Sequence, residues 1–204
     1  MRKLLIATHN PGKRVEIEDL LAATPGGWLE RFELWMPSAL GLDEEVAETG
    51  DTYQDNAALK ARALCQASGL LTLADDSGLE VDALGGAPGV HSRRFAPHPT
   101  ATDADRRALL VEKLAGRPRP WTARFRCVIA LAAPGEELRF AEGRVEGEIL
   151  PEERGHNGFG YDPLFYIPEL DRTMAELTRA EKNRLSHRAR ALLAALPLLE
   201  ELAG

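Results

Sequence analysis

Residues 70–79 read Leu70-Leu71-Thr72-Leu73-Ala74-Asp75-Asp76-Ser77-Gly78-Leu79, an apolar run that leads straight into two adjacent acids. The apolar part is typical of a buried strand, and the pattern predicts that this strand stops at the acids. A strand sends successive side chains to opposite faces, so Asp75 and Asp76 would point in different directions. Two interpretations are open. The acids form a site that holds a cation or deprotonates water, or an Asx-type turn in which Asp76 or Ser77 caps backbone N–H groups.

Strand-like and helix-like patterns alternate on both sides of this stretch, without repeats or low-complexity segments. Apolar runs predict strands over 4–7, 124–132 and 138–149, the last two joined through Pro134-Gly135 as an antiparallel hairpin. Helical spacing predicts helices after residue 13, over 52–67, over 103–114 and over 180–202, the last kinked or interrupted at Pro197. This order predicts a mixed α/β fold with an antiparallel component, as a single domain over residues 1–204 with two lobes.

The composition is that of an ordinary soluble globular protein, with 204 residues, 44% of them hydrophobic and 28% charged. The formal net charge of -7 gives no general attraction to a nucleic-acid backbone or an anionic membrane, although local basic patches can bind small anions. We therefore expect neither polymeric nucleic acid nor a membrane as a partner.

Cysteine usage and the N-terminus bear on the cellular compartment. Cys65 and Cys127 lie far apart and form no Cys-x-x-Cys motif, so we expect buried, reduced thiols and neither a disulfide framework nor a zinc site. The first apolar run is too short for a signal peptide, and no segment is long enough to span a bilayer. A cytoplasmic location is expected.

The loop after the first strand reads Thr8-His9-Asn10-Pro11-Gly12-Lys13 and precedes a helix. Backbone N–H groups and the positive end of a helix dipole favour an anion at such a place, and Lys13 adds a positive charge. The loop lacks the glycine spacing of a Walker A motif. A phosphate cradle and a simple N-cap at Asn10 with a solvated Lys13 are both compatible with this pattern.

Polar residues near the predicted 52–67 helix form a second candidate group. Asn56 and Lys60 are four residues apart and so share one helix face. Most such pairs on surface helices belong to an exposed polar stripe. Glu48 belongs to an acidic run before this helix. Two interpretations of Glu48 are open: a residue of a solvated loop, or a second metal carboxylate beside Asp76.

Residues 155–163 read Gly-His-Asn-Gly-Phe-Gly-Tyr-Asp-Pro, and this density of glycines indicates unusual backbone or close approach of a ligand. Phe159 suits stacking on a nucleobase and Asp162 suits accepting a ring N–H, whereas a tight turn would make Phe159 and Tyr161 core anchors. A basic, hydrogen-bonding cluster begins the last predicted helix and suits carbonyl oxygens on a ring. It consists of Lys182, Ser186, His187 and Arg188.

Six motifs follow one another along nearly the whole chain. They are Thr8-x-Asn10-x-x-Lys13, Gly50-x-Thr52-Tyr53-x-x-Asn56-Ala57-x-x-Lys60-Ala61, Ala74-Asp75-Asp76-Ser77-Gly78-Leu79, Gly85-Gly86-Ala87-Pro88-Gly89, Phe159-Gly160-Tyr161-Asp162-Pro163 and Ser186-His187-Arg188. Each motif alone is modest, but the ordered combination is highly specific. Together they closely resemble the inosine triphosphate pyrophosphatase family, also called Ham1-like or non-canonical purine nucleoside triphosphate pyrophosphatases.

The resemblance implies a fold and an activity. The fold would be α/β, an elongated mixed β-sheet with flanking helices in two lobes around a central cleft, usually in a homodimer. The activity would be that of a hydrolase acting on phosphoric anhydrides, which converts ITP, dITP or XTP to the monophosphate and pyrophosphate. Such an enzyme sanitises the nucleotide pool.

The resemblance also implies roles for single residues. Asp76 would be the proton acceptor and a Mg²⁺ ligand, and Glu48 would be a second metal ligand, although some relatives carry an additional acid where this chain has Ala47. The residues that would bind the substrate are Thr8, His9, Asn10, Pro11, Gly12, Lys13, Lys60, Ser77, Phe159, Gly160, Tyr161, Asp162, Lys182, His187 and Arg188. The members of this set from Phe159 onward would surround the base.

Two alternatives remain. One is a Maf-like nucleotide pyrophosphatase acting on other nucleotides, which the Ser186-His187-Arg188 motif argues against. The other is a non-catalytic nucleotide-binding module, which the intact Asp75, Asp76 and Lys60 argue against. The sequence ranks neither ITP, XTP and dITP nor Mg²⁺ and Mn²⁺.

Overall fold

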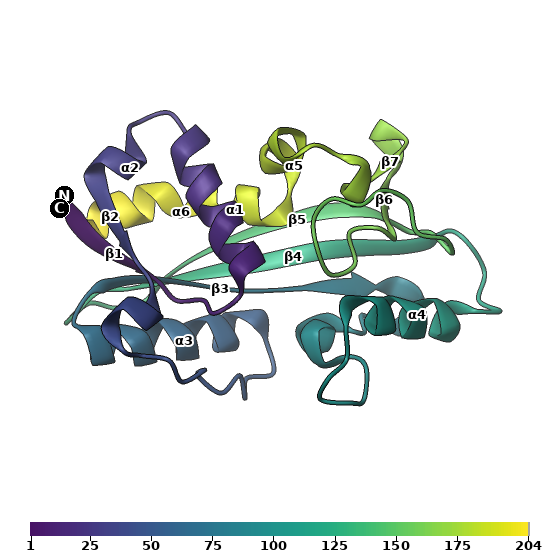
Figure 1. Cartoon of the computed structure of the whole chain (residues 1–204), viewed down its shortest axis with the longest axis horizontal. Helices are drawn as coiled ribbons and strands as arrows, with labels where there is room; N and C mark the ends of the chain where they lie inside the picture. The colour runs from purple at the N-terminus through teal and green to yellow at the C-terminus, as the bar shows by residue number, and fades with distance from the viewer. Residues whose placement is uncertain (204) are drawn as a thin grey trace. The chain divides into compact units, whose positions relative to one another are not determined.

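A computed structural model describes residues 1–203 of the chain, shown in Figure 1. The helices are α1 (Pro11–Ala23), α2 (Trp28–Arg31), α3 (Tyr53–Ser68), α4 (Asp103–Leu114), α5 (Arg179–Leu185) and α6 (His187–Ala203). The strands are β1 (Arg2–Ile6), β2 (Phe32–Trp35), β3 (Leu71–Val81), β4 (Trp121–Ala132), β5 (Arg139–Ile149), β6 (Phe165–Ile167) and β7 (Arg172–Thr173). Within residues 1–203, no helix is both long and apolar enough to cross a lipid bilayer.

The strands form one mixed sheet with the order β2-β1-β3-β4-β5-β6-β7. Strand β1 pairs in parallel with β2 and β3, whereas β6 pairs antiparallel with β5 and β7. Strands β4 and β5 are neighbours joined only by residues 133–138, which is too short for a parallel crossover, so they form the expected hairpin. The predicted mixed α/β fold with an antiparallel component is confirmed.

Three strands contribute to two compact units. Unit 1 comprises Met1–Asp76, Cys127–Gly143 and the chain from His187 onward, and unit 2 comprises Ser77–Arg126 and Arg144–Ser186. Strand β4 illustrates the division, because Phe125 is buried in the core of unit 2 and Cys127 in the core of unit 1.

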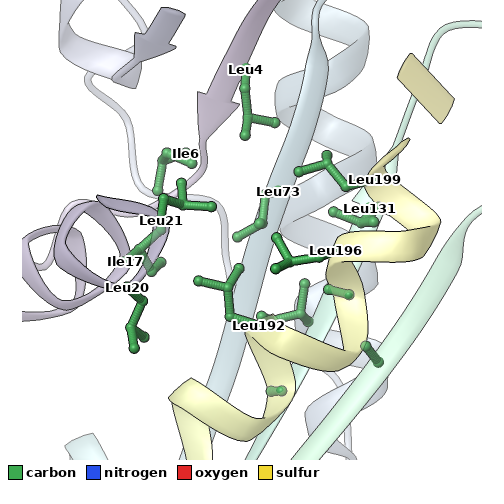
Figure 2. Close-up of a cluster of buried hydrophobic side chains, with 14 of the residues drawn as sticks. Leu4, Ile6, Ile17, Leu20, Leu21, Leu73, Leu131, Leu192, Leu196 and Leu199 are labelled. Carbon is green, nitrogen blue, oxygen red and sulfur yellow. The ribbon is translucent and has the colours of Figure 1, made fainter. Parts of the chain in front are cut away.

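The core of unit 1 lies where α1 and α6 cover β1 and β3, as Figure 2 shows. Helix α1 contributes Ile17 and Leu21, and α6 contributes Leu192 and Leu199, all at helical spacing. Each fully buried leucine supplies about 1.5–3 kcal/mol of transfer free energy. Helix α3 lies on the other face of this part of the sheet (Figure 1). Both cysteines are free and buried, as expected.

The core of unit 2 is built from α4, the strands and the segment after β5. Leu110 and Leu114 of α4 join a cluster with Phe125 and Phe165, whose ring centroids lie 4.5 Å apart. Helix α4 begins and ends where the sequence predicts, and Thr102 and Asp105 form a capping box at its start.

Strand β3 does not stop at the two acids. It continues to Val81, and the predicted strand end is therefore wrong, as is the Asx-type turn. Beyond the acids, Leu79 and Val81 are buried in the core of unit 2 while Glu80 between them is partly exposed. This alternation extends the strand, because burial and pairing outweigh the weak strand propensity of Asp and Gly.

The predicted helix over 180–202 is divided in two. Helix α5 ends at Leu185, Ser186 adopts an extended conformation with φ -63° and ψ 155°, and α6 begins at His187. The interruption falls at Ser186 and not at Pro197, which lies within α6. The chain passes from unit 2 to unit 1 at this point, so tertiary packing on each side outweighs the local helical pattern.

Candidate active site

The two adjacent acids of β3 bind different partners. Asp76 Oδ2 accepts a hydrogen bond from Asn56 Nδ2 at 3.2 Å. Asp75 Oδ2 instead lies 3.0 Å from Lys13 Nζ and 3.2 Å from Arg188 Nε. Both carboxylates are buried. The expectation that strand alternation separates them is confirmed, since Asn56 belongs to α3 and Lys13 to α1.

Lys60 joins the acids of unit 1 into one group. Its ammonium lies 2.7 Å from Glu48 Oε1, 2.7 Å from the main-chain oxygen of Asp75 and 3.7 Å from Asp76 Oδ1. We call Glu48, Asn56, Lys60, Asp75 and Asp76 the acidic group. Glu48 and Asp76 therefore both face the Lys60 ammonium. The carboxylate ligands of a hard cation also face one common positive charge.

Local structure at the start of α3 places two members of this group. Thr52 caps the helix by accepting from Asp55 N, and Asn56 Oδ1 accepts from Gly50 N at 2.8 Å. A Cβ on Gly50 would lie 2.5 Å from Asp55 Cβ, so only glycine fits there. Asn56 and Lys60 then follow one helical turn apart and reach the same acid, Asp76.

The environment sets the two acids apart chemically. Burial raises the pKa of Asp76 above its ordinary value, and the charges of Glu48 and Asp75 add to this against the opposing effect of Lys60. Burial would also raise the pKa of Asp75, but the charges of Lys13 and Arg188 outweigh it and hold that pKa well below the usual range. Asp76 is thus the better proton acceptor near neutral pH, and Asp75 stays an anion.

The loop from Thr8 to Lys13 forms the N-cap of α1. Asn10 Oδ1 accepts from Gly12 N at 2.9 Å and from Lys13 N at 3.3 Å, while Thr8 Oγ1 accepts from Asn10 N at 3.1 Å. The N-cap interpretation of Asn10 is confirmed. A solvated Lys13 is wrong, because its ammonium pairs with the buried Asp75. His9 contacts the main-chain oxygen of Leu42 at 3.3 Å.

Arg188 is buried at the start of α6, where its exposed fraction is 1%. Its guanidinium binds Asp75 from one side, and its NH1 group forms an ion pair with Glu16 of α1. The neighbouring His187 is buried as well. Arg188 thus neutralises two carboxylates inside unit 1, a contact that the basic cluster in the sequence did not indicate.

A second group of predicted residues lies in unit 2. Asp162 Oδ2 accepts from Phe159 N at 2.9 Å and lies 2.6 Å from Lys182 Nζ. The Lys182 ammonium is also 4.9 Å from the centroid of the Phe159 ring. We call Phe159, Asp162 and Lys182 the loop group. Gly158 has φ +78°, and a Cβ there would collide with the Asp162 carboxylate, so this glycine is required.

The structure distributes the predicted site residues between the two units. Unit 1 holds residues 8–13, Glu48, Lys60, Asp76, His187 and Arg188. Unit 2 holds Ser77, residues 159–162 and Lys182. Tyr161 is a core anchor of unit 2, as one interpretation of the loop expected, and its hydroxyl donates to the Ser92 main-chain oxygen at 2.9 Å.

Sequence reasoning did not assign several residues that complete these groups. Asn56 was visible through its helical spacing with Lys60, and Asp75 through its place beside Asp76. Glu16 gave no signal, because an acid on an amphipathic helix is ordinarily solvated, and here it contacts a residue 172 positions away.

Comparison with known proteins identifies the family. Residues 4–198 match the model of the Ham1 family. The chain belongs to the Ham1 family. A protein from Bacillus subtilis (strain 168), named dITP/XTP pyrophosphatase, is 46% identical over 200 residues, which are 98% of either chain. A protein of the same name from Exiguobacterium sp. (strain ATCC BAA-1283 / AT1b) is 52% identical over 190 residues, 93% of each chain.

Solved structures of similar proteins share the fold. A HAM1 protein from Coxiella burnetii superimposes with a TM-score of 0.86 at 40% identity, covering 98% of this chain and 100% of its own. The nucleoside-triphosphatase, or dITP/XTP pyrophosphatase, of Mycobacterium abscessus superimposes with a TM-score of 0.74 at 43% identity, covering 97% and 99%. The mixed sheet with flanking helices that the Ham1 resemblance implied is confirmed.

Proposed function

We propose that this chain hydrolyses non-canonical purine nucleoside triphosphates, namely ITP, dITP and XTP, to the monophosphate and pyrophosphate. Relatives named dITP/XTP pyrophosphatase, 46% and 52% identical over nearly its whole length, support the substrate class. The observation that carries the proposal is the buried Asp76 carboxylate, held by Asn56 and facing the Lys60 ammonium. This arrangement provides a proton acceptor beside positive charge, which hydrolysis of a phosphoric anhydride requires.

The proposed reaction assigns Asp76 the role of general base. Water attacks the α-phosphorus, and its proton passes to the Asp76 carboxylate. The bond from the α-phosphorus to the oxygen that bridges to the β-phosphorus breaks, and pyrophosphate leaves with that electron pair. The raised pKa of Asp76, caused first by its burial, makes it a stronger base than an exposed aspartate.

Lys13 and Lys60 are the proposed phosphate contacts. Both ammonium groups are largely buried, with exposed fractions of 16% and 13% for their side chains. Each is held by an acid of the acidic group, so neither has to be ordered when the triphosphate arrives. We propose that phosphate oxygens share these ammonium groups with the carboxylates and that the lysines bind the triphosphate whatever the base.

The donor set of the acidic group fits Mg²⁺. Within residues 1–203, no three His, Cys, Asp or Glu side chains gather so as to hold a metal ion by themselves. Mg²⁺ commonly retains several waters and takes only one or two carboxylates together with substrate phosphates, so Glu48 and Asp76 suffice as its protein ligands. When bound, it would offset negative charge on the leaving pyrophosphate.

The loop group is the proposed recognition element for the base. Phe159 offers a ring face for stacking, while Asp162 and Lys182 supply an acceptor and a donor for polar groups of a purine edge. A site that pairs with the 6-keto edge of hypoxanthine or xanthine leaves polar groups unpaired against adenine, which discriminates strongly. The substrate role of Arg188 and the homodimer remain predictions from the family resemblance, and the cytoplasmic location remains a prediction from cysteine usage and the N-terminal sequence.

A nucleotide panel tests the proposed function. Purified protein with Mg²⁺ is expected to release pyrophosphate from dITP, ITP and XTP, and far less from ATP, GTP or pyrimidine triphosphates. Chelation of divalent cations should abolish the release, and added Mg²⁺ should restore it. A preference for pyrimidine or modified nucleotides would favour a Maf-like activity, and release of orthophosphate alone would refute cleavage at the α-phosphorus.

Asp76→Asn tests the proposed base. The amide is nearly isosteric and keeps the contact with Asn56, but it neither accepts the proton of water nor binds Mg²⁺ as a carboxylate does. Pyrophosphate release from dITP is expected to fall by at least about a hundredfold. Asp43→Asn, at an exposed aspartate, is the matched control and should retain the parent rate. Near-parental activity of Asp76→Asn would refute this assignment.

A further inference from the structure

Two side chains of α4 hold a single residue of the loop that follows β5. Asp103 Oδ2 accepts a hydrogen bond from Gly160 N at 2.8 Å, and Arg107 NH1 donates one to Gly160 O at 2.9 Å. Asp103 and Arg107 are four residues apart, so they project from the same face of α4. Helix α4 therefore forms hydrogen bonds with both the N–H and the C=O group of Gly160.

Asp103 and Arg107 each form a further ion pair. The Asp103 carboxylate also pairs with Arg106 at 2.5 Å. Burial opposes its charge, but the hydrogen bonds from Arg106 and Gly160 hold the pKa of Asp103 below its ordinary value, so it remains an anionic acceptor at neutral pH. Arg107 Nε pairs with Glu153 at 2.8 Å, which orients its guanidinium. Hydrogen bonds from charged groups to backbone are stronger than neutral ones.

Gly160 lies directly after Phe159. The backbone N–H of Phe159 is held by Asp162, and the next N–H along the chain, that of Gly160, is held by Asp103. Gly160 has φ +63°, a left-handed conformation that glycine adopts without strain. The direction in which the Phe159 ring leaves the backbone therefore depends on contacts at both of these amides.

We propose that Asp103 and Arg107 are positioning residues that fix the Phe159 ring for stacking on the purine base. This inference rests on the proposed function, because it takes Phe159 as the stacking surface. Asp103 and Arg107 act through Gly160 and not on the substrate. They are expected to govern KM for substrates that carry a base and to leave the chemistry at the α-phosphorus unchanged.

Arg107→Met is the central variant, since methionine keeps an apolar stem and removes the donor to Gly160 O. Asp103→Ala removes the acceptor for Gly160 N, and Asp103→Asn restores an acceptor oxygen at the same place. Glu153→Gln is the matched control, because the amide oxygen of glutamine still accepts from Arg107 Nε and orients the guanidinium, while the charge of the outer pair is removed and the contact with Gly160 O is kept. All four are assayed with dITP and with deoxyribose 5-triphosphate, which has no base.

For Arg107→Met and Asp103→Ala, KM for dITP is expected to rise about ten- to a hundredfold, as for the loss of one stacked base, with kcat near the parent value. Their kcat/KM for deoxyribose triphosphate should equal that of the parent. Asp103→Asn and Glu153→Gln should resemble the parent on both substrates. This contrast is one that a general loss of structure would not produce.

Two results would overturn the inference. An unchanged KM for dITP in Arg107→Met would show that the loop needs no support from α4, and an equal loss on both substrates would show a general structural role. If Asp103→Ala does not fold, Arg107→Met decides, since the Thr102–Asp105 capping box of α4 is intact in it. Failure of the proposed function is distinguishable, because the parent itself would then release no pyrophosphate from dITP.

Discussion

Asp75 is the residue on which the buried charges of unit 1 converge. Its Oδ2 atom meets Lys13 and Arg188, and its main-chain oxygen meets Lys60. The Asp75 Oδ2 atom also lies 3.8 Å from Cys127 Sγ, and burial first and Asp75 second raise the pKa of that thiol to about 12. Cys127 is consequently a neutral, unreactive thiol at physiological pH. The proposed phosphate contacts thus depend on an acid that need not take part in the chemistry.

Asp75→Asn is expected to destabilise the protein by about 3–5 kcal/mol, because it leaves the buried Lys13 and Arg188 without their shared anion. Urea unfolding at neutral pH measures this change. Asp82→Asn is the matched control, since Asp82 forms an ion pair with Arg124 at the surface and its loss should cost about 0–1 kcal/mol. Equal stabilities of Asp75→Asn and the parent would contradict the role of Asp75 as the buried counter-ion.

Helix α6 packs closely on β5 because that strand carries a glycine at the contact. A Cβ on Gly143 would overlap the main-chain oxygen of His187 and the amide nitrogen of Ala191, neither of which can rotate away. Glycine has a low propensity for strands and so weakens β5, but its lack of a side chain allows α6 to approach the strand. This approach places His187 and Arg188, the first residues of α6, inside unit 1.

Gly143→Ala is expected to lower the free energy of unfolding by about 1–3 kcal/mol or more, because the added methyl must displace α6 from β5. Chemical denaturation measures the effect. Glu137→Ala, at an exposed position in the connection between β4 and β5, should change stability by less than about 0.5 kcal/mol. A neutral Gly143→Ala would mean that the helix does not press on the strand.

Helix α5 carries a pH-dependent cap at its start. Glu181 accepts from Arg172 NH2 and from both the N–H and the hydroxyl of Thr178, each at 2.8 Å. These hydrogen bonds, the one from Arg172 first, lower the pKa of Glu181 from 4.5 to about 2. A group with a lowered pKa stabilises the folded state above its unfolded pKa, and this stabilisation disappears as pH falls through the folded value.

We expect the parent to be more stable than Glu181→Gln at neutral pH, with the difference in urea midpoint constant down to about pH 5. Below the ordinary pKa of 4.5 the difference should shrink, and it should vanish near pH 2. Midpoints measured across this range test the cap. A difference that does not change with pH would show that the charge of Glu181 contributes nothing.

Within residues 1–203, the same strands contribute to two hydrophobic cores. In β4, Ala123 and Phe125 belong to the core of unit 2, while Cys127 and Ile129 belong to the core of unit 1. Truncation of one core therefore weakens strands that the other core also uses. This continuity favours cooperative unfolding of the chain, although each unit has a core of its own.

Leu73→Ala in unit 1 and Leu110→Ala in unit 2 are each expected to cost about 2–5 kcal/mol, since both side chains are fully buried. Urea titration followed by amide NMR signals from each unit tests cooperativity. Either variant should lower the midpoints of the signals from both units alike. A variant that moved only the signals of its own unit would contradict shared unfolding.

The sequence by itself determined the features that neighbouring residues encode. The starts of α1, α3 and α4 are set by Asn10, Thr52 and Thr102, whose side chains cap the amides two or three residues further on. The β4–β5 hairpin follows from two strand patterns close to each other, and the ordered motifs indicated the Ham1 family. Asn56 and Lys60 shared a face for the same local reason, the helical repeat.

Only the tertiary structure decided those features in which long-range contacts oppose or complete the local sequence pattern. It extended β3 through two acids, divided the last helix at Ser186, and added the short α2 and β2 that the sequence did not reveal. It also paired Arg188 with Asp75, 113 residues away, and with Glu16, 172 residues away. The physical reason is the same in each case: strand pairing, burial and buried ion pairs depend on residues that are distant in the chain, and their free energies exceed local propensities.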